Sequence, residues 1–198
     1  MPEPRNIIYQ RLGVASGIVA PIVGFACILG AIVSYSQFSW ANNALSDLGV
    51  VSGTTGMIFN FGLIVTGLLT FNFAAFGLFN YLGKSWVGKI GVAVFAAASL
   101  ALIAIGVFNE NFSPTHYIVS AAFFVLMPLS LFILTFTFWF SHHRGLAGFT
   151  VLIGATAALP WILEFTLNYV PNVAVPETVS GLAVSAWAIV LGRKMLKA

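Results

Sequence analysis

The chain has 198 residues, of which 8 are Lys or Arg and 5 are Asp or Glu, and its net charge is +3. Only 7% of its residues are charged and 60% are hydrophobic, whereas an average soluble domain is about 25% charged. So few charges cannot cover the surface of a soluble protein. The composition excludes a soluble domain, a disordered chain and a nucleic-acid-binding protein, and it indicates an integral membrane protein.

Six apolar runs are long enough to cross a bilayer, because a membrane helix needs about 20 apolar residues. The predicted helices cover about residues 12–35, 57–81, 87–108, 117–140, 146–163 and 175–192. Each run is apolar on every face, as expected for a helix surrounded by lipid. The short loops between most runs favour antiparallel neighbours. The predicted fold is all-α, with residues 1–198 forming one compact bundle of six transmembrane helices.

The basic residues predict the orientation of this bundle. With six helices, every Lys and Arg falls on one side, and these residues are Arg5, Arg11, Lys84, Lys89, Arg144, Arg193, Lys194 and Lys197. Basic residues concentrate in cytoplasmic loops. We therefore expect a multi-pass protein of the cell membrane with both termini cytoplasmic. Four of the five acids fall on the opposite side, which this rule does not require: Asp47, Glu110, Glu164 and Glu177.

The connections and helix interiors carry further signals. The longest loop, Ser36–Gly56, is expected to lie in the interface or to dip back into the bundle, with Trp40 as an interfacial anchor. Pro128 and Pro160 should bend their helices. Two pairs of small residues have the spacing of close helix packing, which we expect within the chain rather than in a dimer. These pairs are Gly13 with Gly17, and Gly62 with Thr66.

The polar residues on the outer side are candidates for a functional site, because ionisable residues at membrane depth are costly. A histidine beside carboxylates can act as a general base oriented by an acid, or can bind a divalent metal. The candidate catalytic residues are His116, Asp47, Glu110 and Ser46, and the alternative metal ligands are His116, Asp47 and Glu110. Structural roles are open as well. Asp47 can cap a turn, and Glu177 suits the first turn of the last helix.

The identity of any cofactor is not determined by the sequence, but one class is excluded. The histidines are His116, His142 and His143. His116 and His142 are 26 residues apart on one predicted helix, which is roughly 39 Å at 1.5 Å per residue. No other predicted helix supplies a histidine, so the chain cannot hold a bis-histidine haem by itself.

Two segments at these positions resemble motifs of the domain of unknown function 998 family. The first motif is Asn43-Ala-Leu-Ser46-Asp47-Leu-Gly49, followed by Phe59-Asn60 and Gly67; the second is Gly106-Val-Phe108-Asn109-Glu110, followed by His116, Ala121 and Phe124. The resemblance spans roughly residues 10 to 192 and implies a six-helix membrane protein. The family usually has proline where this chain has Asn109. The first motif also resembles, more distantly, eukaryotic membrane proteins of autophagy modulation and lipid-anchor remodelling.

Two hypotheses for the function follow. The first is a lipid-binding or lipid-modifying polar pocket near the outer leaflet, with membrane lipids as partners. If that pocket is catalytic, we expect hydrolysis or acyl or headgroup transfer, with His116 as base and Ser46 as nucleophile in a metal-free version. The second is a non-catalytic subunit that packs against other membrane subunits, because no loop is large enough to form a domain. The sequence does not decide whether the protein is an enzyme.

Overall fold

The computed structural model describes residues 4–82 and 85–197, with side chains from residue 7 onward. The side chains of Arg5 and Lys84, which entered the orientation argument, lie outside this description. The long helices are α1 (Pro4–Ser34), α2 (Thr54–Asn72), α4 (Trp86–Val107), α5 (Thr115–Phe140), α6 (Arg144–Leu167) and α7 (Ala174–Leu196). A π-helical turn, η2 (Phe73–Leu78), and the short α3 (Phe79–Leu82) continue α2. Two 3-10 turns, η1 (Ser46–Val50) and η3 (Glu110–Phe112), lie in the loops.

This architecture confirms the all-α prediction. Within residues 4–82 and 85–197, six helical segments are long and apolar enough to cross a membrane, counting α2 to α3 as one segment over Thr54–Leu82. The described residues contain no strand. Most helices extend a few residues beyond the predicted limits, and α1 begins at Pro4 rather than near residue 12. The predicted limits mark where the apolar residues end, whereas the helical backbone hydrogen bonds continue into the polar residues on either side.

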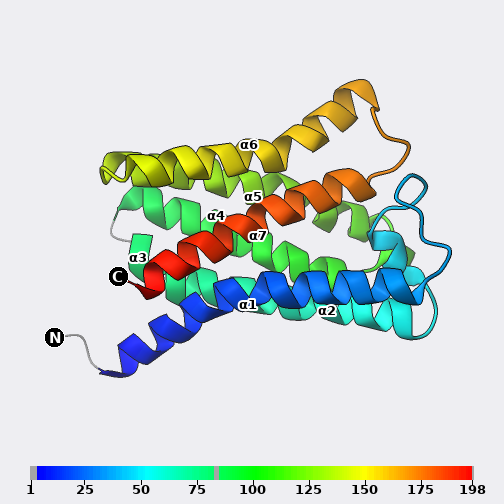
Figure 1. Cartoon of the computed structure of the whole chain (residues 1–198), viewed down its shortest axis with the longest axis horizontal. Coiled ribbons are helices and arrows are strands. Elements are labelled where there is room, and N and C mark those ends of the chain that lie inside the picture. The colour runs from blue at the N-terminus through cyan, green and yellow to red at the C-terminus, as the bar shows by residue number, and fades with distance from the viewer. Residues whose placement is uncertain (1–3, 83–84, 198) are drawn as a thin grey trace.

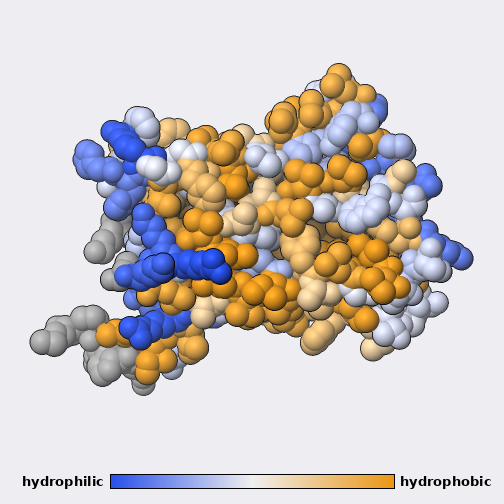
Figure 2. All heavy atoms as spheres, in the orientation of Figure 1, coloured by the Kyte–Doolittle hydropathy of each residue, from blue (hydrophilic) through white to orange (hydrophobic). Residues whose placement is uncertain are grey.

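The helices form a closed ring in chain order. Each spanning segment packs against the next, and α7 returns to pack against α1. Both termini lie at the same end of the bundle (Figure 1). The space-filling view shows an apolar band across the middle and hydrophilic residues at the two ends (Figure 2). We call the end with the termini the basic end, and the end with η1 and η3 the acidic end.

Aromatic residues mark the membrane interface at the basic end. The Arg144 guanidinium lies 3.6 Å from the centre of the Trp139 ring, and Lys89 Nζ lies 5.5 Å from that of Trp86. Both tryptophans are exposed on the surface of the bundle. Tryptophan prefers the headgroup level of a bilayer. The basic end therefore has the tryptophan and basic residues that are typical of the headgroup level of a bilayer.

Small residues let the helices approach closely inside the chain. A Cβ at Gly13 would lie 2.7 Å from Gly77 N in η2, and one at Gly62 would clash with the Cβ of Cys27 in α1. Both pairs of small residues expected to pack inside the chain therefore do so, at the contacts of α1 with α2 and η2. Pro128 and Pro160 lie inside continuous helices, and Figure 1 shows that α6 bends in its C-terminal half.

The described residues form two hydrophobic clusters in the interior. The cluster nearer the basic end includes Phe73, Phe95 and Trp187, whose rings pack against one another. Trp187 Nε1 also donates to Thr150 Oγ1 at 3.0 Å, which satisfies both buried polar groups. The cluster nearer the acidic end includes Leu48 and Phe59. The pocket described below has walls from both clusters.

Candidate functional site

The long first loop closes the acidic end of the ring. Its η1 turn is inserted into the bundle, so that Leu45, Ser46 and Leu48 are buried. The Glu177 carboxylate on α7 accepts a hydrogen bond from Leu45 N at 2.6 Å. Asn172 Nδ2 donates to Asn42 O at 2.9 Å. Of the two positions expected for this loop, in the interface or inside the bundle, the structure shows the second. Hydrogen bonds attach the loop to the start of α7 and to the residues before it.

Asp47 has a local structural role within this loop. Its Oδ2 accepts hydrogen bonds from Asn43 Nδ2 at 2.7 Å and from Ala44 N at 3.1 Å. Asn43 Oδ1 in turn accepts from Ser39 N at 3.0 Å. Side chains of this type commonly stabilise turns in this way. The geometry therefore matches the capping role considered for Asp47 from the sequence.

The two motif segments meet at the carbonyl of Gly49. Asn60 Nδ2 on α2 donates to Gly49 O at 2.8 Å, and Asn109 Nδ2 donates to the same oxygen at 3.2 Å. Asn109 Oδ1 also accepts from Asn111 N at 3.2 Å and so caps η3. Asn109 has a φ of −65°, a value that proline also adopts. Asn109 therefore has a backbone angle that a proline could also adopt, and its side chain adds hydrogen bonds to the loop.

His116 is the best-oriented ionisable group at the acidic end. It is buried in the first turn of α5, and its Nδ1 lies 2.7 Å from Phe108 O. A carbonyl oxygen can only accept, so Nδ1 carries the proton and Nε2 of the neutral ring is an acceptor. Nε2 lies 3.4 Å from Ser120 Oγ and 3.9 Å from Glu110 Oε1. The Phe108 carbonyl thus directs the basic nitrogen of His116 toward Ser120 and Glu110.

Glu110 lies among other polar groups at this end. Burial raises the pKa of its carboxyl above the ordinary value of 4.5, and the negative charge of Asp47 raises it further. The Ser46 hydroxyl and His116 act in the opposite direction. Glu177 is also close enough for its charge to interact with those of Asp47 and Glu110. These five side chains therefore form one cluster, which we call the acidic cluster: Ser46, Asp47, Glu110, His116 and Glu177.

We expect Glu110→Gln to make the protein more stable than wild type at pH 8 and to have a smaller effect at pH 5. A raised pKa means that the folded state holds the proton more tightly than the unfolded chain. The stability contributed by that proton is present below pH 4.5 and is lost as the pH rises through the raised pKa. The amide resembles the protonated acid at every pH.

Thermal unfolding in detergent at both pH values measures this effect as the difference in Tm between the variant and wild type. A difference that is the same at pH 5 and pH 8 would contradict the assignment to Glu110.

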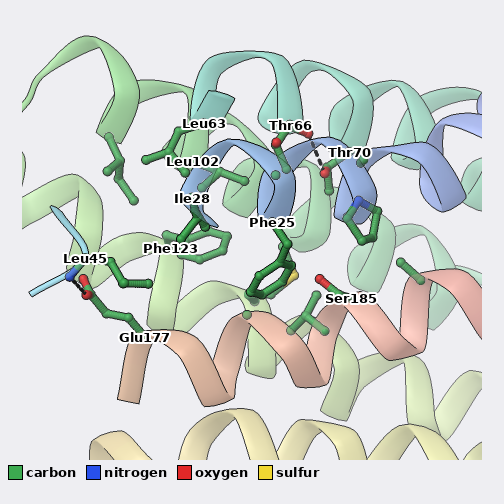
Figure 3. A pocket seen from close by; sticks show the side chains of 18 of the residues that line it. Phe25, Ile28, Leu45, Leu63, Thr66, Thr70, Leu102, Phe123, Glu177 and Ser185 are labelled. Carbon is green, nitrogen blue, oxygen red and sulfur yellow. Dashed lines mark hydrogen bonds between the residues drawn. The ribbon is translucent and has the colours of Figure 1, made fainter. Parts of the chain in front are cut away.

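An apolar pocket extends from the acidic cluster into the ring of helices. Its empty volume is about 1010 Å³, counting the open space at its mouth. Leu45, Ser46, Ser120 and Glu177 line its acidic end, and Phe73 and Phe95 line its opposite end. Figure 3 shows Phe25, Ile28 and Phe123 around the pocket, with Glu177 at one end bonded to the Leu45 backbone. The pocket is therefore polar at one end and apolar along its length.

Comparison with known proteins identifies the family of this chain. The profile of a family described as protein of unknown function, DUF998, matches residues 18–194. The chain belongs to the DUF998 family. Neither a curated protein nor a solved structure matches the chain. The match confirms the family resemblance of the two motifs, while the likeness to the autophagy-modulation proteins stays a prediction.

In this DUF998 protein the structure brings several of the expected site residues together. Glu110 and His116 are in contact, and Asp47 and Ser46 lie next to Glu110. Glu164, at the end of α6, accepts a hydrogen bond from Val170 N in the loop between α6 and α7, at 3.4 Å. Among the residues that the structure describes, no group of three His, Cys, Asp or Glu side chains has the spacing to hold a metal ion. The geometry therefore gives no support to the metal alternative of His116, Asp47 and Glu110.

One residue of the candidate site was missed from the sequence. The serine that contacts His116 Nε2 is Ser120, whereas Ser46 lies beside Glu110. A signal was present, because Ser120 follows His116 by four residues and such residues share a helix face. That spacing alone does not show that both side chains turn toward the interior of the bundle.

Proposed function

We propose that this protein binds a membrane lipid, with an acyl chain in the apolar pocket and the polar head at the acidic cluster. The observation that carries the proposal is the shared lining: Ser46 and Glu177 belong to both the cluster and the pocket. An amphiphile needs a polar site and an apolar space that are continuous.

The seam between α1 and α7 supports entry from the bilayer. Residues of both helices line the pocket, including Gly17 and Phe25 on α1 and Gly181 on α7. Near the basic end the two helices touch, because a Cβ at Gly192 would lie 2.9 Å from Ile18 Cγ1. Toward the acidic end Phe25 is the group nearest to Gly181, and a Cβ there would lie 3.4 Å from Phe25 Cζ. A lipid chain entering near Gly181 therefore has to displace the Phe25 side chain.

The acidic cluster favours particular lipid heads. The carboxyl groups of Asp47, Glu110 and Glu177 would repel a phosphate that carries the only charge of its lipid. They accept hydrogen bonds from hydroxyl and ammonium groups. We therefore propose a neutral glycerolipid, or a lipid with an ammonium group, as the ligand.

Native mass spectrometry of the protein purified in mild detergent tests this proposal. We expect a protein population that retains one lipid, and we expect added diacylglycerol or phosphatidylethanolamine to exchange into it in preference to phosphatidylglycerol. Protein that carries no lipid under conditions that keep it folded would contradict the proposal. A complex with a second polypeptide would instead support the alternative, a subunit of a larger membrane assembly.

We also propose that the basic end faces the cytoplasm, which places the acidic cluster near the outer leaflet of the cell membrane. The support is the position of the basic residues on the basic side: Lys89, Arg144 and Arg193 lie within four residues of a helix end, and Arg11 lies in the first third of α1. We expect green fluorescent protein fused after residue 198 to fluoresce, and alkaline phosphatase fused there to be inactive. The same reporters inserted between residues 168 and 172 should give the reverse result. Phosphatase activity at the C-terminal fusion would contradict this orientation.

A further inference from the structure

We infer that Ser120 and His116 form a nucleophile and base pair that transfers an acyl chain from a lipid ester, an inference that rests on the proposed lipid binding. Ser120 lines the pocket, and its Oγ lies 3.4 Å from His116 Nε2. The proton on Nδ1, bound to Phe108 O at 2.7 Å, leaves Nε2 as the basic nitrogen. Nucleophile and base contacts are often this long before substrate binds.

The hydroxyl of Ser120 differs from most others in the pocket. Thr66, Thr70 and Thr178 also line it, and each donates to the carbonyl four residues earlier in its own helix. That bond is the usual one for a hydroxyl inside a membrane helix. Ser120 is instead directed at the histidine ring. The Ser46 hydroxyl interacts with Glu110, and Ser185 lines the pocket without a side-chain hydrogen bond to another described residue. Among the described residues that line the pocket, Ser120 is therefore the hydroxyl with a histidine beside it.

The depth of Ser120 suits an ester group. It follows the first residue of α5 by five positions, which is roughly 7.5 Å along the helix. Tyr117 and Ile118 are already exposed on the outer surface, as lipid-facing residues would be. The interfacial layer on each side of the hydrocarbon is about 5–8 Å thick. A lipid held with its head at the acidic cluster would place its ester carbonyl near Ser120 and its chain beyond.

The chemistry uses only the chain, the lipid and an acceptor. Ser120 Oγ attacks the ester carbonyl carbon while its proton moves to His116 Nε2. The bond from that carbon to the alkoxy oxygen then breaks, and the leaving alcohol takes the proton from Nε2. Water, or a second alcohol or amine, repeats the sequence in reverse and releases the acyl chain from Ser120. The carboxylate of Glu110, 3.9 Å from Nε2, stabilises the positive charge that His116 carries between these proton transfers.

A long-chain alkyl fluorophosphonate tests the pair. Its alkyl chain suits the pocket, and a base-activated serine attacks phosphorus with loss of fluoride, which leaves a stable adduct. We expect one adduct per protein by intact mass, mapped to Ser120 by peptide analysis. Ser120→Ala should lose the adduct with little change in Tm. His116→Gln should slow labelling by about 10²–10⁴-fold, the usual contribution of a general base.

Ser185→Ala is the matched control, because it removes another hydroxyl of the same pocket, one that has no histidine beside it. Labelling should be unchanged in this variant. The inference is overturned if wild type is not labelled, if the adduct maps to Ser46 or Ser185, or if His116→Gln reacts at the wild-type rate. Unlabelled protein that still retains lipid in native mass spectrometry overturns the acyl transfer alone and leaves lipid binding intact.

Discussion

Gly181→Leu should reduce the amount of lipid retained by the purified protein by about tenfold or more, which is roughly 1.4 kcal/mol of binding free energy. Gly181 lines the pocket, and a Cβ there would make only an ordinary contact with Phe25 at 3.4 Å. The remaining atoms of leucine would therefore occupy the space proposed for the acyl chain. The backbone has no reason to move, so the variant should fold. Native mass spectrometry gives the retained fraction directly.

Gly148→Leu is the control for this substitution. Gly148 lies on α6 and is exposed, and a Cβ at this position would have no neighbouring atom within 4 Å. The same side chain is added to the same type of membrane helix, but it points away from the bundle. Equal lipid loss in both variants would show that the lipid sits on the outer surface and not in the pocket.

Gly106→Ala should destabilise the protein by about 1–3 kcal/mol, the typical cost of overpacking a core. A Cβ at Gly106 on α4 would lie 2.6 Å from Asn60 O and 3.1 Å from Ile64 N on α2. These are backbone atoms, so no rotation of a side chain can relieve the clash. The two helices must separate, and that would also disturb the Asn60 bond to Gly49. The Tm in detergent should fall by several degrees.

The matched variant for stability is Gly148→Ala, which introduces the same methyl group into open space. Alanine is favoured over glycine inside a helix by roughly 0.5–1 kcal/mol. This variant should therefore unfold at the same temperature as wild type or slightly higher. A Gly106→Ala protein as stable as Gly148→Ala would contradict the close packing of α2 and α4.

The membrane helices were predictable because lipid solvation acts on each segment separately. A run of about 20 apolar residues meets the requirement for crossing a bilayer whatever the other helices do. The π-helical turn at Phe73–Leu78 was not predictable on that basis. It packs against α1, where a Cβ at Gly13 would lie 2.7 Å from Gly77 N. The apolar residues of this turn would fit an α-helix equally well. Only the contact between the turn and α1 therefore distinguishes a π-helical from an α-helical conformation here.

The candidate site was predictable in part. The acids and His116 were placed at one end because topology alone puts alternate loops on the same side. Their hydrogen-bond partners depend on how the loops fold. In the folded protein Asp47 accepts from a residue of its own turn, and Glu177 accepts from the backbone N–H of Leu45. Ser120 is a further example, because its partner is decided by the rotation of α5 about its axis. A sequence pattern that is apolar on every face does not encode that rotation.

The sequence by itself determined the class of protein, the number of membrane helices and the end of the bundle at which the described charged residues lie. These properties depend on the transfer of single segments from water to lipid, which is local. Only the tertiary structure decided that the ring closes between α7 and α1, that the first loop enters its acidic end, and that a pocket remains inside. These depend on side-chain packing between segments distant in sequence, where shape rather than hydropathy selects the partner.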